Sequence, residues 1–139
     1  MEKMIKFQEG RSYRCRASAF TPIQYGKLFP GHDYLKDIRE MGEKNQEIED
    51  GETPDFTMDD YEMFVRLAYT FVYQGLSESP KMNDAQRDFI EEYPDPWTWL
   101  DSFDSFSIYE ILPEITELWI GNDKSLSTAK NQNPAPPEK

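Results

Sequence analysis

The spacing of apolar residues divides the chain into a short N-terminal part and a longer body. Apolar and polar residues alternate at 5–8 (Ile-Lys-Phe-Gln) and again at 13–17 (Tyr-Arg-Cys-Arg-Ala). Side chains of a strand point alternately to its two faces, so this period of two predicts half-buried strands. A glycine-containing turn separates them, and residues 1–20 are therefore predicted to form a β-hairpin. Its apolar face, with Tyr13 and Cys15, needs a helical partner because an isolated hairpin is only marginally stable.

From residue 21 the apolar residues recur at the spacing of amphipathic helices. Thr21 and Pro22 are typical of a helix start, with threonine as the N-cap and proline at the first helical position. The strongest helix signal begins at Thr57, which with Asp60 has the spacing of a capping box. Its later turns are apolar nearly all round, so this helix is predicted to be the most buried element. The predicted helices cover residues 21–29, 33–43, 57–75, 83–92, 97–103 and 107–119, and residues 42–56 are predicted to be an acidic loop.

The C-terminal end changes character after the last predicted helix. Pro113 is expected to kink or split that helix because proline lacks a backbone N–H group, and Gly121 is expected to end it. Residues 121–139 are mostly small, polar or proline, so they are predicted to be a disordered tail. Residues 1–120 are predicted to form one α+β, mostly helical domain, in which the hairpin packs on a bundle of about five short helices (21–120).

The chain is strongly acidic, with a net charge of −12 and a pI near 4.4. Such a surface repels nucleic acid and anionic membranes, so neither is an expected partner. The charge is uneven, because residues 1–27 carry six basic and two acidic side chains. Attraction between the basic end and the acidic body acts either within one molecule or between molecules. For the second case we hypothesise self-association through Arg14, Arg16, Glu49 and Asp50.

Side chains capable of chemistry are few and isolated. Cys15 is the single cysteine, so no internal disulfide is expected, and its place on the apolar strand face predicts a buried, inert thiol. His32 is the single histidine and lies in a predicted loop without a partner residue. A calcium loop starting at Asp50 fails because its fifth position is Pro54. We therefore expect no catalytic residue, no metal and no cofactor.

Two further expectations concern location and the remaining acids. No run approaches the ~20 apolar residues of a membrane span, and the N-terminus lacks the apolar run of a signal peptide, so a soluble cytoplasmic protein is expected. Asp101 and Asp104, close to two tryptophans, leave a hydrolase with a carboxylate pair as an alternative. Sequence spacing alone does not bring those two carboxylates together in space.

The stretch 94–121 is rich in large apolar rings interspersed with acids. Burying each large apolar side chain gains roughly 1.5–3 kcal/mol, so these rings are buried either within the domain or against a partner. Both possibilities stay open at this point. If a partner covers them, the groove is predicted to contain Trp97, Trp99, Phe103, Phe106 and Trp119.

Two segments carry a resemblance to a known family. Residues 21–29 (TPIQYGKLF) are followed by His32-Asp33 and by Leu-Lys-Asp at 35–37. Residues 99–119 contain Trp-Leu, Phe-Asp and a final helix that ends in tryptophan, and a polar tail with lysines follows. Together they resemble the two terminal signatures of tail assembly chaperones from long-tailed phages and prophages of Gram-positive bacteria.

The resemblance implies a protein of the host bacterial cytoplasm that is absent from the mature virion. It would bind and solubilise the long, helical, apolar tape measure protein during tail morphogenesis, in several copies as a homo-oligomer. The family is commonly made in two lengths by ribosomal frameshifting, and the extension of the long form recruits the major tail (tube) protein. Two alternatives from other classes remain: an acidic phage inhibitor that mimics DNA, and a structural subunit of the tail.

Overall fold

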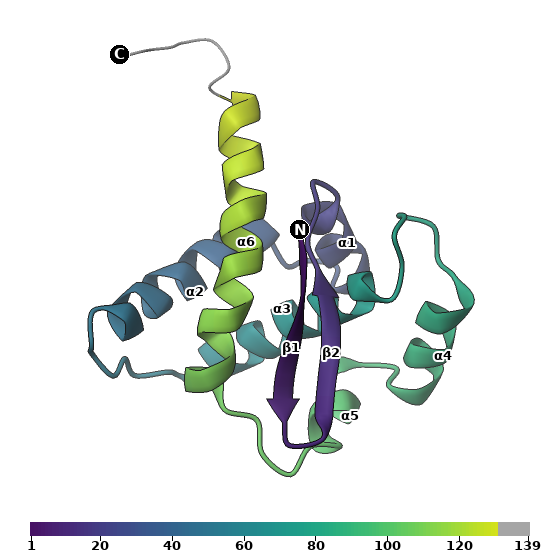
Figure 1. Ribbon diagram of the computed structural model, residues 1–139, viewed down its shortest axis with the longest axis horizontal. Coiled ribbons are helices and arrows are strands. Elements are labelled where there is room, and N and C mark those ends of the chain that lie inside the picture. The colour runs from purple at the N-terminus through teal and green to yellow at the C-terminus, as the bar shows by residue number, and fades with distance from the viewer. Residues whose placement is uncertain (131–139) are drawn as a thin grey trace.

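The computed structural model describes residues 1–130, with side chains described as far as Trp119 (Figure 1). Within these residues a two-stranded antiparallel hairpin is followed by six helices, which confirms the predicted α+β, mostly helical fold. None of these helices has a stretch long and apolar enough to cross a membrane. The elements are β1 (Glu2–Gln8), β2 (Arg11–Arg16), α1 (Thr21–Leu28), α2 (Tyr34–Glu49), α3 (Met58–Gly75), α4 (Asp84–Glu92), α5 (Pro96–Asp101) and α6 (Ile108–Lys130).

The hairpin packs one face on the helices, as its alternating sequence predicts. Gly10, at φ +81°, allows the tight turn between β1 and β2. Ile5 and Cys15 are fully buried on the inner face, whereas Met4 and its cross-strand neighbour Arg14 lie on the outer face. Figure 1 shows α3 behind the hairpin and α6 beside β1. The helices thus provide the apolar support that an isolated hairpin lacks.

Helix α3 is the central element, as predicted. Thr57 and Asp60 form the expected capping box, in which each side chain accepts a hydrogen bond of 3.0 Å from the other residue's backbone N–H. Every residue from Met63 to the end of the helix is buried. At that end α3 packs against β2 so closely that a Cβ on Gly75 would lie 1.8 Å from the backbone oxygen of Arg14. Gly75 is the last helical residue, as the predicted range 57–75 has it, and this close approach is the reason for its missing side chain.

Two predicted boundaries on the N-terminal side are wrong. Helix α2 continues through Gly42 to Glu49, so the loop predicted for residues 42–56 begins later. Gly42 faces Trp119 of α6, whose Nε1 lies 4.0 Å from the position of a Cβ, and this packing overrides the weak helix propensity of glycine. Thr21 is the first helical residue rather than the N-cap. Its hydroxyl instead donates a 2.6 Å hydrogen bond to Oε1 of Gln74 in the core.

The last helix also differs from the prediction. Helix α6 continues past Gly121 to Lys130, so residues 122–130 are helical rather than disordered. Pro113 does not split the helix, because it lies in the second turn and removes only the hydrogen bond to the Tyr109 carbonyl. The Ser107 hydroxyl, just before the helix, accepts a 3.3 Å hydrogen bond from the backbone N–H of Glu110. The remainder of the predicted tail, residues 131–139, lies outside the described residues.

A buried polar network joins the first three helices. The Tyr25 hydroxyl donates a 2.6 Å hydrogen bond to Oδ2 of Asp37 and accepts one of 3.2 Å from Nε of Arg66. A terminal nitrogen of Arg66 lies 3.9 Å from the same carboxylate. All three residues are buried, so each depends on the others for its polar contacts. The network fixes how α1 and α2 sit on α3.

Candidate partner-binding surface

Trp99, one of the three tryptophans of the C-terminal stretch, lies in the core. It is fully buried, and its Nε1 is 3.4 Å from the hydroxyl oxygen of Tyr13. Six rings surround it with centroids 5.2–6.4 Å away, in the edge-to-face arrangements that aromatic pairs favour. The hairpin, three helices and the α5–α6 connection all contribute to this set. We call it the aromatic cluster: Phe7, Tyr13, Tyr69, Phe89, Trp99, Phe103 and Phe106.

The structure does not bring the five predicted groove residues to one surface. Trp99, Phe103 and Trp119 are buried, and Phe106 is half-buried within the aromatic cluster. Trp97 alone among the five is exposed, with 43 % of its surface accessible. Helix geometry explains the split, because residues two apart on a helix point about 200° apart. One tryptophan of α5 therefore faces the core while the other faces outward.

Eight large apolar side chains of the described residues remain exposed once the core is complete. Half of them are methionines, whose flexible thioether side chains adapt to differently shaped partners. Trp97 is the largest, and it is mounted on a short helix with Pro96 buried at the first position and Asp95 as the N-cap. Of this group, only Trp97 is among the residues predicted for the groove. The eight are Met1, Met4, Ile23, Leu35, Met58, Met82, Trp97 and Tyr109.

Acidic residues flank Trp97 in the sequence. Asp101 follows it by four residues on α5, which places the two on the same side of the helix. The preceding helix α4 ends in Glu91 and Glu92, both exposed. A partner with an apolar side chain flanked by lysine or arginine would be complementary to Trp97 and these carboxylates. Its cations would be attracted both to the carboxylates and to the face of the aromatic ring.

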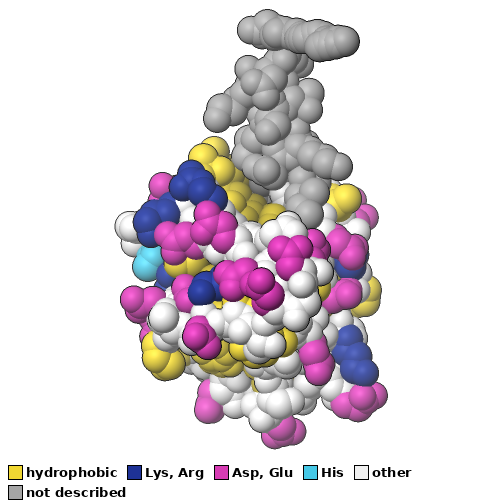
Figure 2. All heavy atoms as spheres, turned by 90° about the vertical axis from the view of Figure 1, so that its left-hand side faces the viewer, with side chains coloured by type: hydrophobic (Ala, Val, Ile, Leu, Met, Phe, Trp, Pro, Cys, Tyr) yellow, Lys and Arg dark blue, Asp and Glu magenta, His cyan; other side chains and the backbone are white. Residues whose placement is uncertain are grey.

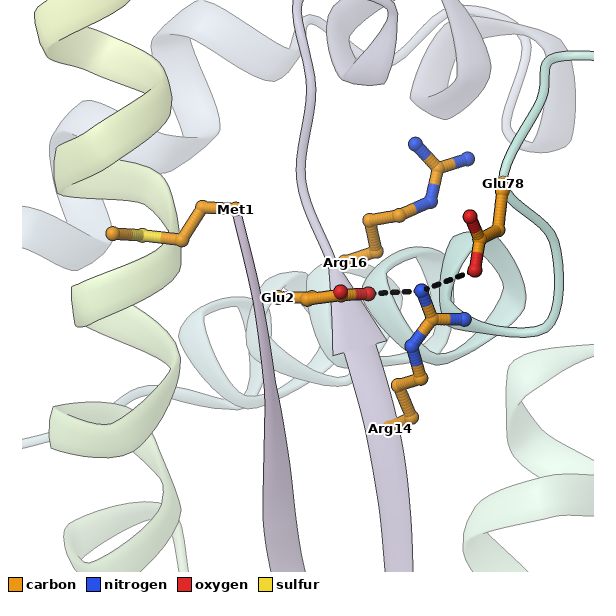
Figure 3. Close-up of a pocket in the computed structure, with 5 residues that line it drawn as sticks. All are labelled: Met1, Glu2, Arg14, Arg16 and Glu78. Atoms are coloured by element: carbon orange, nitrogen blue, oxygen red, sulfur yellow. Dashed lines mark hydrogen bonds and ion pairs between the residues drawn. The ribbon is translucent and has the colours of Figure 1, made fainter.

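The arginines predicted to mediate self-association lie on the outer hairpin face, at an open pocket of about 270 Å³ (Figure 3). Arg14 donates a 2.8 Å hydrogen bond to the Gly75 carbonyl and forms ion pairs with Glu2 and Glu78. Nε of Arg16 donates a 3.0 Å hydrogen bond to the carbonyl of Gln74. The pocket is lined by Met1, Glu2, Arg14, Arg16 and Glu78.

Their predicted counterparts, Glu49 and Asp50, lie at the C-terminal end of α2. Figure 1 shows this end at the left of the molecule, well away from the pocket beside the hairpin. The carboxylate of Glu49 accepts a hydrogen bond from Nδ2 of Asn45, and that of Asp50 accepts one from Nε2 of Gln46. The four residues therefore do not meet within one molecule, and self-association through them stays a prediction.

The residues considered for catalysis in the sequence are either buried and unreactive or exposed at the surface. Burial raises the pKa of the Cys15 thiol to about 12, so it is protonated and unreactive at neutral pH. His32 is exposed at the surface. Asp101 and Asp104 are exposed as well. Trp99, which lies close to them in the sequence, is buried, so its ring is not available to a substrate beside those carboxylates as the hydrolase alternative would require.

The pocket on the outer hairpin face differs from a typical small-molecule site. The pocket of about 270 Å³ is lined mainly by charged side chains, and small-molecule sites are generally concave and mostly apolar. Comparisons with protein-family models, with curated proteins and with solved structures found no match. The geometry and charge of the described residues are therefore the structural basis for a proposal about function.

Proposed function

We propose that this chain is a tail assembly chaperone that keeps the apolar helices of a tape measure protein in solution. The observation that carries the proposal is the exposure of Trp97, at 43 %, two residues from the fully buried Trp99. Large aromatic anchors supply most of the binding energy at many protein interfaces, and tryptophan is the most enriched among them. Trp97 is the anchor of the proposed contact.

The position of Trp97 supports this role. Its helix is held by the buried Pro96 and by the Asp95 side chain, which accepts a 2.7 Å hydrogen bond from the backbone of Thr98. An anchor on a rigid base loses little conformational freedom when a partner binds. The acids around it favour a partner helix that carries basic residues beside its apolar ones.

The resembling segments support a shared fold more directly than a shared surface. Tyr25 and Asp37 of the first segment belong to the buried network, and Trp99 and Trp119 of the second are core residues. Residues that build the core are those that a common fold would require. Trp97 lies outside both segments, so its role in binding is inferred from its exposure alone.

Co-expression with a candidate tape measure protein, a long helical protein encoded beside this chain, tests the proposal. We expect the wild-type chain to raise the soluble yield of the long protein. Trp97→Ala is expected to weaken the complex about 30-fold, the loss that accompanies truncation of a tryptophan anchor worth about 2 kcal/mol. Tyr109→Ala is the matched control, because Tyr109 is an aromatic residue with the same 43 % exposure on a different helix.

The two parts of the proposal fail separately. A long protein that is no more soluble with the wild-type chain than without it would remove the chaperone role. Equal losses with Trp97→Ala and Tyr109→Ala would remove Trp97 as the anchor and leave the chaperone role standing. Thermal unfolding of both variants shows whether either change has disturbed the fold.

One observation favours the DNA-mimic alternative as a second candidate. The extension of α2 places Glu43, Glu47 and Glu49 on an ordered helix, where the sequence predicted a loop for Glu47 and Glu49. Figure 2 shows acidic side chains spread over this side of the molecule. A DNA mimic is expected to displace DNA from a host DNA-binding protein, and neutralising these three glutamates should abolish the competition. Absence of such competition in a pulldown from host lysate counts against this candidate.

A further inference from the structure

The outer face of the hairpin is turned away from the helices and carries apolar and basic side chains together. In Figure 1 it faces the viewer, with α3 behind it. Met4 is 64 % exposed and lies opposite Arg14 in the register, and Met1, at 65 %, lines the adjoining pocket. Exposed methionines are common at surfaces that bind other proteins, because their flexible side chains adapt to the partner. The face therefore combines an adaptable apolar contact with arginine side chains.

The pocket on this face contains a guanidinium group with unused donors. Nε of Arg16 donates a hydrogen bond to the Gln74 carbonyl, which holds the side chain in place. Its two terminal nitrogens form no ion pair with a carboxylate of the described residues, and in Figure 3 the dashed lines from the two glutamates run to Arg14 alone. An anion that enters the pocket can therefore bind Arg16 without displacing an existing ion pair.

The two acids of the pocket belong to the other arginine. Glu2 pairs closely with Arg14, whose Nη1 also donates a hydrogen bond to the Gly75 carbonyl. Glu78 lies 3.3 Å from the same guanidinium with its side chain 84 % exposed, so this pair contributes little to stability. Glu78 is thus a weakly held carboxylate that would compete with an incoming one.

The chemistry of the pocket favours a carboxylate over a phosphate group. Glu2 and Glu78 already place two negative charges there, so a dianion is repelled more strongly than a single carboxylate. The guanidinium fork of Arg16 matches the two oxygens of a carboxylate. At about 270 Å³ the pocket has room for an acidic side chain and for part of the chain that carries it. A peptide carboxylate is therefore the ligand group that fits.

We propose that the outer hairpin face binds an acidic, partly apolar segment of a partner protein, with one carboxylate on Arg16 and an apolar side chain on Met4. These two residues are diagonal neighbours across the strands, and such side chains lie roughly 7–8 Å apart. Side chains two residues apart in an extended chain lie on one side at about 7 Å, so the expected pattern is an acid, any residue and an apolar residue.

Charge complementarity supports an acidic partner even though the whole chain is acidic. Residues 1–27 carry six basic and two acidic side chains, and salt screens charges that lie further away than about 8 Å. Trp97 is flanked by acids in the sequence and favours a basic partner, so the two surfaces select partners of opposite charge. The proposal goes beyond the tape measure contact and does not depend on it.

Nuclear magnetic resonance of the isotope-labelled full chain tests the proposal. The probe is a synthetic peptide, Gly-Glu-Ser-Leu-Ser-Glu-Gly, blocked at both ends, and the matched peptide has glutamine in place of each glutamate. We expect the acidic peptide to shift the Nε–H signal of Arg16 and the methyl signal of Met4 until both saturate. The glutamine peptide should bind about tenfold more weakly, and added salt should weaken the acidic peptide.

Single substitutions separate the two contacts. Arg16→Gln, followed at the Met4 methyl group, is expected to weaken peptide binding about tenfold, as truncation of one partner of a charge pair does. Met4→Ser, followed at Arg16, should weaken it about fourfold, the effect of leaving one methylene group unburied. Glu78→Gln should strengthen binding because it removes the competing carboxylate. Arg87→Gln on α4 removes the same charge as Arg16→Gln and should bind as wild type.

Several results would overturn the proposal. Equal binding of the two peptides would show that no carboxylate is recognised, and equal losses in Arg16→Gln and Arg87→Gln would show that only net charge matters. Inorganic phosphate that saturates the Arg16 signal at a lower concentration than the peptide would assign the pocket to phosphate. Pocket signals that respond to the concentration of the chain itself, and not to peptide, would assign the face to a second copy. Circular dichroism melting curves check that each variant is folded.

Discussion

Trp97 and Trp99 stand two residues apart on α5 and have opposite environments. Trp99 is surrounded by six rings from elements across the whole chain and makes no contact with solvent. Trp97 has 43 % of its surface accessible and belongs to the group of apolar side chains left outside the core. Two tryptophans of one short helix thus lie in different places, one in the core and one on the surface. The difference teaches that an aromatic-rich segment is not by itself evidence of a binding groove.

The two faces of the hairpin repeat this division. Cys15 and Ala17 on the inner face are buried against the helices, whereas Arg14 and Arg16 on the outer face line the pocket. A strand sends neighbouring side chains to opposite faces, as a short helix does for residues two apart. Core and surface positions close together in the sequence therefore differ in what a substitution costs. Measurements on the two tryptophans, on two helical glycines and on Cys15 compare buried with open positions.

The largest contrast is expected between the two tryptophans. Trp99→Ala should lower the free energy of unfolding by about 3–5 kcal/mol, because it leaves a large cavity at the centre of the aromatic cluster. Trp97→Ala should cost less than about 1 kcal/mol, since its side chain is already half in solvent. Urea denaturation followed by circular dichroism measures both. Similar losses for the two variants would contradict their assignment to core and surface.

The second contrast concerns two helical glycines. Gly75→Ala should lower stability by at least about 1–3 kcal/mol, because the added methyl group would overlap the Arg14 backbone, 1.8 Å away. Gly26→Ala, inside α1 with nothing within 4 Å of its Cβ position, should raise stability by about 0.5–1 kcal/mol. Thermal unfolding of the two variants gives the sign directly. A stabilising Gly75→Ala would mean that β2 and α3 are not in close contact.

The smallest effect is a pH dependence from the inner hairpin face. Burial raises the pKa of Cys15 from its ordinary 9.0 to about 12, so above pH 9 the unfolded chain loses this proton before the folded protein does. Stability from this residue is fully present below pH 9 and declines as the pH rises toward 12.

Comparison with Cys15→Ala isolates that residue. Buried tyrosines with raised pKa, such as Tyr25 and Tyr69, add to the alkaline loss in both proteins and cancel in the difference. Between pH 9 and 10 the wild type should lose roughly 1 kcal/mol more than Cys15→Ala, as measured by urea denaturation at each pH. Parallel pH profiles would show that the thiol is accessible to water.

Much of the local structure was determined by the sequence alone. The alternating strands, the glycine turn and the capping box at Thr57 are set by neighbouring residues, and the structure confirms them. The central position of α3 also followed, because a helix that is apolar nearly all round has to be covered on every side. These features depend on short-range geometry, which the order of residues specifies directly.

Only the tertiary structure decided where contacts between residues distant in the sequence override the local preferences of the chain. Gly42 stays helical because α6 packs on it, and Thr21 gives its hydroxyl to Gln74 instead of capping a helix. The candidate site was decided in the same way. The aromatic residues were visible in the sequence, but which rings are buried and which are exposed depends on contacts with elements far away in the chain, such as that between Phe7 and Trp99. Whether a side chain is buried depends on how the whole chain folds. The sequence therefore identified the aromatic residues but could not assign Trp99 to the core and Trp97 to the surface.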